Sequence, residues 1–60
     1  MEEIKAIKEY AEQNGFIFEV FWGEYFLFKD EDGIEYKTKL NDEQVLNLLC
    51  GNEIELTWYC

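Results

Sequence analysis

The stretch "FKDEDGIEY", residues 28–36, decides how the middle of this chain folds. Gly33 lies in the centre of the stretch, and glycine readily adopts the left-handed backbone conformation that a tight turn requires. We therefore predict a β-hairpin with a three-residue loop at residues 31–33. This loop defines four cross-strand pairs: Asp30 with Ile34, Phe28 with Tyr36, Phe26 with Thr38, and Lys29 with Glu35.

Runs of aromatic and β-branched residues predict three strands around this loop. Two of them, residues 25–30 and 34–40, form the hairpin itself. The third, "FIFEVFW" at residues 16–22, comes before them and is joined to the hairpin by a tight turn at Gly23-Glu24. The three strands should therefore form one antiparallel sheet.

Apolar residues at helical spacing predict a first helix at residues 2–14, which ends at Gly15. A second helix should begin after Asn41, because Gln44 stands three residues later and completes a capping box. Gly51 should end this helix. The side of the second helix that we expect to be buried is made of four residues: Val45, Leu46, Leu48 and Leu49.

Residues 53–58, "EIELTW", alternate between acidic or polar and apolar side chains and predict a fourth strand. The expected fold is therefore a single α+β domain over residues 1–60, in the order α-β-β-β-α-β, with two short helices on one face of an antiparallel sheet. The other face would stay uncovered, and an apolar patch of this kind is typical of a partner or dimer interface. Its expected residues are Ile17, Phe21, Tyr25 and Leu27.

The charge balance limits the classes of partner. The chain has 14 acidic residues against 5 Lys and no Arg, which gives a formal net charge of -9. Direct binding to nucleic acid or to an anionic membrane is disfavoured, because both need clustered basic residues. A basic protein partner is favoured, although the same charge would also keep an aromatic-rich chain soluble without any partner.

The residue types present argue against catalysis and against a bound metal or cofactor. The chain contains no His, Ser or Arg, so no base is available to activate Cys50 or Cys60. A calcium loop aligned on the acids of residues 30–33 would place Phe28 and Lys39 at positions that need oxygen ligands. We expect no enzyme activity, no cofactor and no metal. Cys50 reads as a small buried residue and Cys60 as a free thiol, which fits a reducing cytoplasm.

Acidic residues concentrate in the predicted hairpin loop and around the second helix. An acidic surface on rigid strands can substitute for the phosphates that a nucleic-acid-binding protein recognises, and an exposed aromatic residue such as Trp22 or Tyr25 could anchor the contact. For Trp58 we favour core packing. The expected partner-binding residues are Asp30, Glu31, Asp32 and Glu35, with Glu24, Asp42 and Glu43 as secondary members.

Two resemblances, which together span residues 25–56, point the same way. The α-β-β-β-α order with the acidic hairpin "EDGIEY" resembles small phage-encoded type II-A anti-CRISPR proteins. The segment "DEDGIEYKTKLND", followed by a helix and "GNEIEL", is similar to acidic phage inhibitors of uracil-DNA glycosylase. The fourth strand departs from the first family and the first helix from the second. The resemblances imply a cytoplasmic DNA mimic that inhibits a basic, nucleic-acid-handling host protein. The alternative is a structural or adaptor domain that forms a homodimer through its uncovered sheet face.

Overall fold

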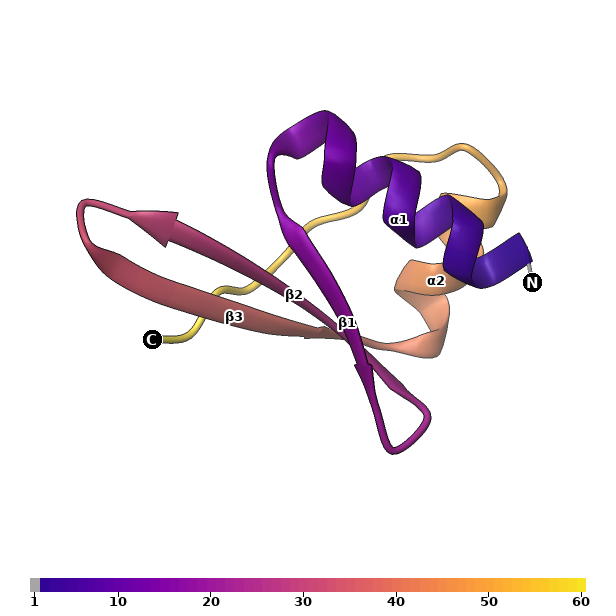
Figure 1. Cartoon of the computed structure of the whole chain (residues 1–60). Coiled ribbons are helices and arrows are strands. Elements are labelled where there is room, and N and C mark those ends of the chain that lie inside the picture. The colour runs from indigo at the N-terminus through magenta and orange to yellow at the C-terminus, as the bar shows by residue number, and fades with distance from the viewer. Residues whose placement is uncertain (1) are drawn as a thin grey trace.

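The computed structural model describes residues 2–60 and shows an α+β fold in the order α-β-β-β-α. Its three strands form one antiparallel sheet in the order β1-β2-β3. Both helices gather near one end of the sheet, and the β2–β3 hairpin extends away from them (Figure 1). Within residues 2–60, neither helix is long and apolar enough to cross a membrane. The elements are α1 (Glu2–Asn14), β1 (Ile17–Phe21), β2 (Glu24–Glu31), β3 (Ile34–Leu40) and α2 (Asp42–Leu49).

The helix ends are the ones that the sequence predicts. Gly15, with φ +73°, turns the chain after α1 so that the Phe16 N–H donates to the Ala11 carbonyl at 2.8 Å. Gly51, with φ +79°, ends α2 in the same way. Glycine suits both positions because side chains with a Cβ atom rarely adopt a positive φ.

The predicted capping box at the start of α2 is confirmed. The Asn41 side chain accepts a hydrogen bond from the Gln44 N–H at 2.8 Å, and the Gln44 side chain accepts one from the Asn41 N–H at 2.9 Å. The Gln44 side chain also donates to the Glu55 carbonyl at 2.7 Å. One residue therefore caps the helix and fixes the segment that follows it.

The buried side of α2 is narrower than predicted. Val45 is buried and Leu48 is half-buried, but Leu46 and Leu49 are exposed, by 60% and 38%. Residues three apart lie on the same side of a helix. Val45 and Leu48 therefore share the side of α2 that packs inward, and Leu46 and Leu49 share a side that is turned away from it. Cys50 is also exposed, which corrects the expectation that it is buried.

Both hairpins close with two-residue turns, which moves the predicted register by one residue. Trp22-Gly23 and Asp32-Gly33 have φ values of 53°, 73°, 54° and 78°, the positive values that a type I′ turn needs at both positions. The predicted loop at residues 31–33 and the predicted turn at Gly23-Glu24 are therefore wrong. Aspartate tolerates the left-handed conformation, so Asp-Gly alone closes the turn. The observed pairs include Asp30 with Glu35, Lys29 with Tyr36, Phe28 with Lys37 and Phe26 with Lys39.

This register decides which strand residues the helices cover. Leu27 is fully buried and Tyr25 half-buried against the helices, so their predicted place on the uncovered face is wrong. Cross-strand partners share a face, and Ile17 pairs with Phe28. The uncovered face, called the reverse face below, therefore has four apolar members: Ile17, Phe21, Phe26 and Phe28. The core on the covered side is built from Ile7, Ala11, Leu27, Leu40 and Val45.

The C-terminal segment does not form the predicted fourth strand. Only Tyr59 pairs with the sheet, through two backbone hydrogen bonds to Lys37 of 2.7 and 2.8 Å. The predicted alternation of side chains is correct, because Ile54, Leu56 and Trp58 pack against the core. With these three side chains packed against the core, the segment crosses the sheet obliquely and pairs with β3 only at Tyr59 (Figure 1).

Candidate partner-binding surface

Four of the predicted binding residues come together at the far end of the β2–β3 hairpin. This acidic tip consists of Asp30, Glu31, Asp32 and Glu35, and all four residues are exposed. Asp32 lies in the turn, and Asp30 is directly opposite Glu35 on the reverse face. The hairpin carries the acidic tip beyond both helices, so no other element covers it (Figure 1).

The acidic tip keeps most of its charge unpaired. Lys29 lies 3.1 Å from the Glu31 carboxylate, and within residues 2–60 this is the only ion pair that a residue of the tip forms. The predicted pair between Lys29 and Glu35 is absent because the register places Asp30 opposite Glu35 instead. Two like charges in directly opposed positions destabilise a hairpin. This unfavourable arrangement suits a role for the tip outside the fold itself.

Lys29 is held by aromatic rings as well as by Glu31. Its ammonium nitrogen lies 4.7 Å from the centre of the Trp58 ring and 5.6 Å from that of Tyr36. Trp58 also packs edge-on against Phe16, with ring centres 4.8 Å apart. The sequence-based assignment of Trp58 to core packing is therefore correct. Lys29 lies on the covered face of the sheet, on the opposite side from Asp30 and Glu35.

The three secondary residues form a separate group at the opposite end of the hairpin. Glu24 begins β2, whereas Asp42 and Glu43 lie in the first turn of α2. The length of β2 separates Glu24 from the acidic tip by about 20 Å. The Lys39 ammonium nitrogen lies 2.9 Å from the Glu24 carboxylate and forms an ion pair with it. The structure thus brings the four primary acids together and places the three secondary ones away from them.

Sequence reasoning missed two apolar residues of the reverse face, Phe26 and Phe28. Their rings lie in one row with Phe21, with successive centres 5.8 and 6.5 Å apart. Ile17 and Phe21 were predicted there and are 61% and 46% exposed. The sequence signal for these residues is the Asp32-Gly33 dipeptide. Interpreted as a two-residue turn, it places Phe26 and Phe28 on the reverse face.

Trp22 is the most exposed large apolar residue of the described chain. Its side chain is 99% exposed, and its φ of +53° is costly for a residue other than glycine. It stands at the β1–β2 turn, on the side of the molecule away from the acidic tip (Figure 1). Trp22 therefore has the exposure that an aromatic anchor needs, but it lies at the opposite end of β2 from the acidic tip. Tyr25, the other predicted anchor, is half-buried beneath the helices.

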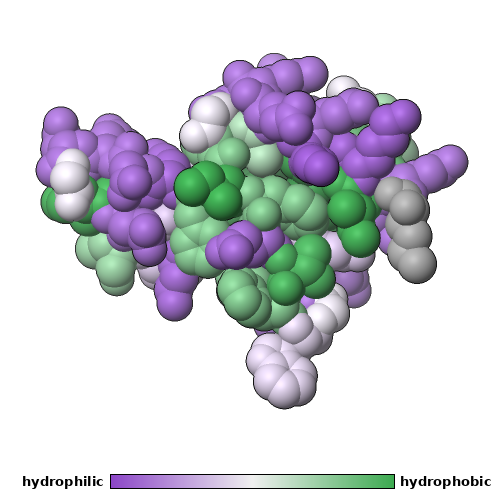
Figure 2. Space-filling model, viewed as in Figure 1, coloured by the Kyte–Doolittle hydropathy of each residue, from purple (hydrophilic) through white to green (hydrophobic). Residues whose placement is uncertain are grey.

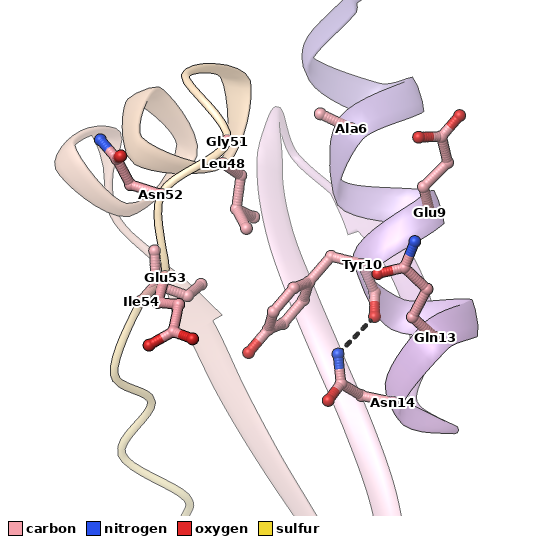
Figure 3. Close-up of a pocket in the computed structure, with 10 residues that line it drawn as sticks. All are labelled: Ala6, Glu9, Tyr10, Gln13, Asn14, Leu48, Gly51, Asn52, Glu53 and Ile54. Atoms are coloured by element: carbon pink, nitrogen blue, oxygen red, sulfur yellow. Dashed lines mark hydrogen bonds between the residues drawn. The ribbon is translucent and has the colours of Figure 1, made fainter.

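A pocket lies between α1 and residues 51–54, where no predicted site residue is found. Figure 3 shows the Tyr10 ring extending from α1 towards residues 53 and 54. Burial raises the pKa of the Tyr10 hydroxyl, and the Glu53 carboxylate raises it further. The lining has no thiol, imidazole or amine, and its titratable groups are the Tyr10 hydroxyl and the Glu9 and Glu53 carboxylates. Among residues 2–60, no three His, Cys, Asp or Glu residues are grouped to hold a metal ion.

Comparison with protein-family models, curated proteins and solved structures returned no significant match. The assignment of function therefore depends on the geometry and the charge of the molecule.

Proposed function

We propose that this protein is an acidic inhibitor that binds a basic, nucleic-acid-handling protein by presenting its acidic tip as a substitute for phosphates. The observation that carries this proposal is the position of the tip. Four exposed acidic residues extend beyond the helices on a two-stranded arm, and among the described residues only Glu31 of these four has a basic partner. An arm of this shape fits a basic groove that normally holds a nucleic-acid backbone.

The distribution of charge supports binding by electrostatic attraction. The formal net charge of -9 speeds the approach to a basic surface, and the close pair Asp30 and Glu35 concentrates negative charge at the end of the arm. The paired strands of the hairpin hold the four residues in one register before the partner arrives, so the backbone of this segment need not be ordered on binding.

The test compares two variants of equal net charge. The first, here the tip variant, carries Asp30→Asn, Glu31→Gln, Asp32→Asn and Glu35→Gln, which lowers the charge from -9 to -5. The matched control carries Glu2→Gln, Glu9→Gln, Glu12→Gln and Glu55→Gln, four exposed positions outside the tip, and also has a charge of -5. Parent and variants are immobilised and exposed to a nuclease-treated bacterial lysate, and bound proteins are eluted with duplex DNA.

The parent and the matched control should retain a protein that duplex DNA displaces, and the tip variant should not. For the purified partner we expect at least a tenfold loss of affinity in the tip variant, mostly through slower association, and a weaker dependence on salt. Equal losses in the tip variant and in the control would show that net charge alone matters and would contradict the proposal. A partner that binds the tip variant normally and ignores DNA would also contradict it.

The apolar row on the reverse face favours the alternative of an adaptor that uses this face. In that case the tip variant should bind as well as the parent does. Phe21→Glu, at a half-exposed position of the row, should then abolish binding.

A further inference from the structure

The outer edge of β1 has backbone groups without partners. In an antiparallel ladder, residues alternate between those that bond to the neighbouring strand and those that face away from it. Phe21 pairs with Glu24 next to the turn, so Phe18 and Val20 are the residues that point their N–H and C=O groups outward. Within residues 2–60 these outward N–H and C=O groups have no backbone hydrogen-bond partner. Figure 1 shows that neither helix crosses this edge.

The two edges of the sheet differ in how they are protected. The β3 edge is bonded by Tyr59 at Lys37, and a second lysine, Lys39, makes that strand unattractive to other strands. The β1 edge has neither protection. Ile17, Val20 and Phe21 are 61%, 44% and 46% exposed, and Figure 2 shows a broad hydrophobic surface over this part of the molecule. An open apolar edge of this kind is a template for another strand.

Glu19 is the one charged residue of β1. It lies between Phe18 and Val20, it is exposed, and it forms no ion pair with the other described residues. A strand added at this edge would place a residue directly beside Glu19 on the reverse face. The most favourable residue at that position is a lysine or an arginine.

We propose that the β1 edge binds an extended strand of the basic partner, which adds to the sheet with a lysine or arginine facing Glu19. Its two neighbouring residues would face Phe18 and Val20 on the opposite side of the sheet, so they should be apolar. The partner segment therefore has the pattern apolar, basic, apolar. This inference rests on the proposed function for the basic character of the partner.

A second copy of this chain is a poorer occupant of the same edge. Two copies could pair their β1 edges in antiparallel orientation. If every free backbone group were used, Phe18 of one copy would pair with Val20 of the other, and the two-fold axis would pass beside Glu19. Glu19 would then face Glu19 of the second copy in the closely spaced type of pair, where like charges are destabilising. The net charge of -9 on each copy adds to the repulsion.

The test uses seven-residue peptides of threonine and valine that differ only in the central residue, which is lysine in one and glutamate in the other. Affinity is measured by NMR titration of the full-length protein, and hydrogen exchange is measured at the Phe18 and Val20 amides. The lysine peptide should bind about two- to fivefold more tightly than the glutamate peptide. It should also slow exchange at both amides, because these become bonded to the added strand.

Substitutions at Glu19 and changes to the peptide show whether the contact is the proposed one. Glu19→Lys should reverse the preference between the peptides, and Glu19→Gln should reduce the ratio of their affinities to about one. A lysine peptide with a methylated backbone should not protect Phe18 or Val20, because it cannot join the sheet. The tip variant should bind the lysine peptide at β1 as the parent does.

The inference would be overturned by no binding at millimolar peptide, by binding that leaves the Phe18 and Val20 amides unprotected, or by a preference that Glu19→Lys leaves unchanged. Loss of peptide binding in the tip variant would place the contact at the acidic tip and would also overturn it. Failure of the proposed function gives a different result. DNA would then not displace the partner from the parent, whereas the peptides would still bind at β1.

Discussion

Two dipeptides, Trp22-Gly23 and Asp32-Gly33, hold the left-handed backbone conformation that closes the two hairpins. Each glycine meets this demand at little cost, whereas Trp22 and Asp32 do so at the cost of backbone strain. Aspartate bears this strain better than most residues. At the scale of single residues, these positions set the register of every strand and therefore decide which side chains reach the core.

The residue Gly33 provides a direct test of the turn. Gly33→Val should lower the free energy of unfolding by about 2 kcal/mol, because a β-branched residue is strained at φ +78°. A Cβ atom at this position would meet no atom within 4 Å, so the loss reports backbone strain and not a clash. Thermal unfolding measures the effect, with Asp32→Asn as a control that should change stability by less than about 0.5 kcal/mol. Unchanged stability of Gly33→Val would contradict the type I′ turn.

The raised pKa of Tyr10 predicts a loss of stability at high pH. The unfolded chain releases the phenolic proton first, near the ordinary value of 10.0, while the folded chain still holds it. The stability that Tyr10 contributes is therefore present below pH 10 and is lost as the pH rises through the folded-state pKa. Urea unfolding on either side of pH 10 should show a steeper loss for the parent than for Tyr10→Phe.

The two causes of the Tyr10 shift can be separated by titration. Glu53→Gln should lower the Tyr10 pKa only part of the way, because burial is the larger cause and remains in place. Phenolate absorbance, taken as the difference between each protein and its Tyr10→Phe version, measures the change. An unchanged Tyr10 pKa in Glu53→Gln would exclude Glu53 as a contributor.

At the scale of elements, the C-terminal segment is not the strand that its sequence predicts. Residues 53–60, called the strap below, cross the sheet and pack against the core. Its polar contacts are few: Gln44 bonds to Glu55 near its start, and Tyr59 bonds to Lys37 near its end. Between these points Ile54, Leu56 and Trp58 pack against the core, and Trp58 also contacts Phe16 and Lys29. The strap covers part of the sheet that two short helices leave open.

Trp58→Ala should therefore be strongly destabilising. It removes the ring contact with Phe16 and the contact with the Lys29 ammonium, and it opens a cavity, at a cost of about 3 kcal/mol. Tyr59→Ala is the matched control, because that side chain is 61% exposed and its backbone bonds to Lys37 remain. Chemical denaturation should show a clear difference between the two variants. Equal losses would show that the strap is held by its backbone and not by Trp58.

The edge of β1 gives a second prediction at this scale. Glu19→Thr removes the only charge of the strand and keeps a residue that favours strands. Two copies should then associate through β1, and the average mass in sedimentation equilibrium should rise with concentration more steeply than for the parent. Glu12→Thr, an exposed change of the same charge on α1, should not have this effect. A monomer in both variants would show that Glu19 does not restrain self-pairing.

The whole molecule has a small core and a large, mostly negative surface. Its accessible area of 4678 Å² exceeds the roughly 4,200 Å² expected for a compact protein of this mass. The open β1 edge, the reverse face and the hairpin arm carrying the acidic tip account for exposed surface that a compact fold would cover. A shape of this kind gives up some stability of the isolated chain and makes surface available for a partner.

Neutralising the tip should therefore stabilise the isolated protein. At low salt the tip variant should melt higher than the parent, because Asp30 no longer repels Glu35. The difference should shrink as salt is added, since salt screens exposed charges. Melting curves at several salt concentrations measure this trend. A tip variant that melts lower than the parent at low salt would mean that the acids support the fold, which would contradict their assignment to partner binding.

The sequence by itself determined the α+β class, the helix ends at Gly15 and Gly51, the capping box at Asn41, and the gathering of four acids in one hairpin. These features depend on local periodicity, on backbone preferences of single residues, or on closeness along the chain. A local pattern is enough to fix such features because no distant residue competes with it.

Only the tertiary structure decided the strand register, the place of Leu27 in the core, the exposure of Leu46 and Cys50, and the path of residues 53–58. A change of one residue in a turn exchanges the two faces of a strand, and sequence alternation is the same in both registers. The C-terminal segment alternates like a strand but buries its apolar side chains across the sheet, since contacts with Phe16 and Lys29 are available there. Such outcomes depend on which distant surfaces remain uncovered after the rest of the chain has packed.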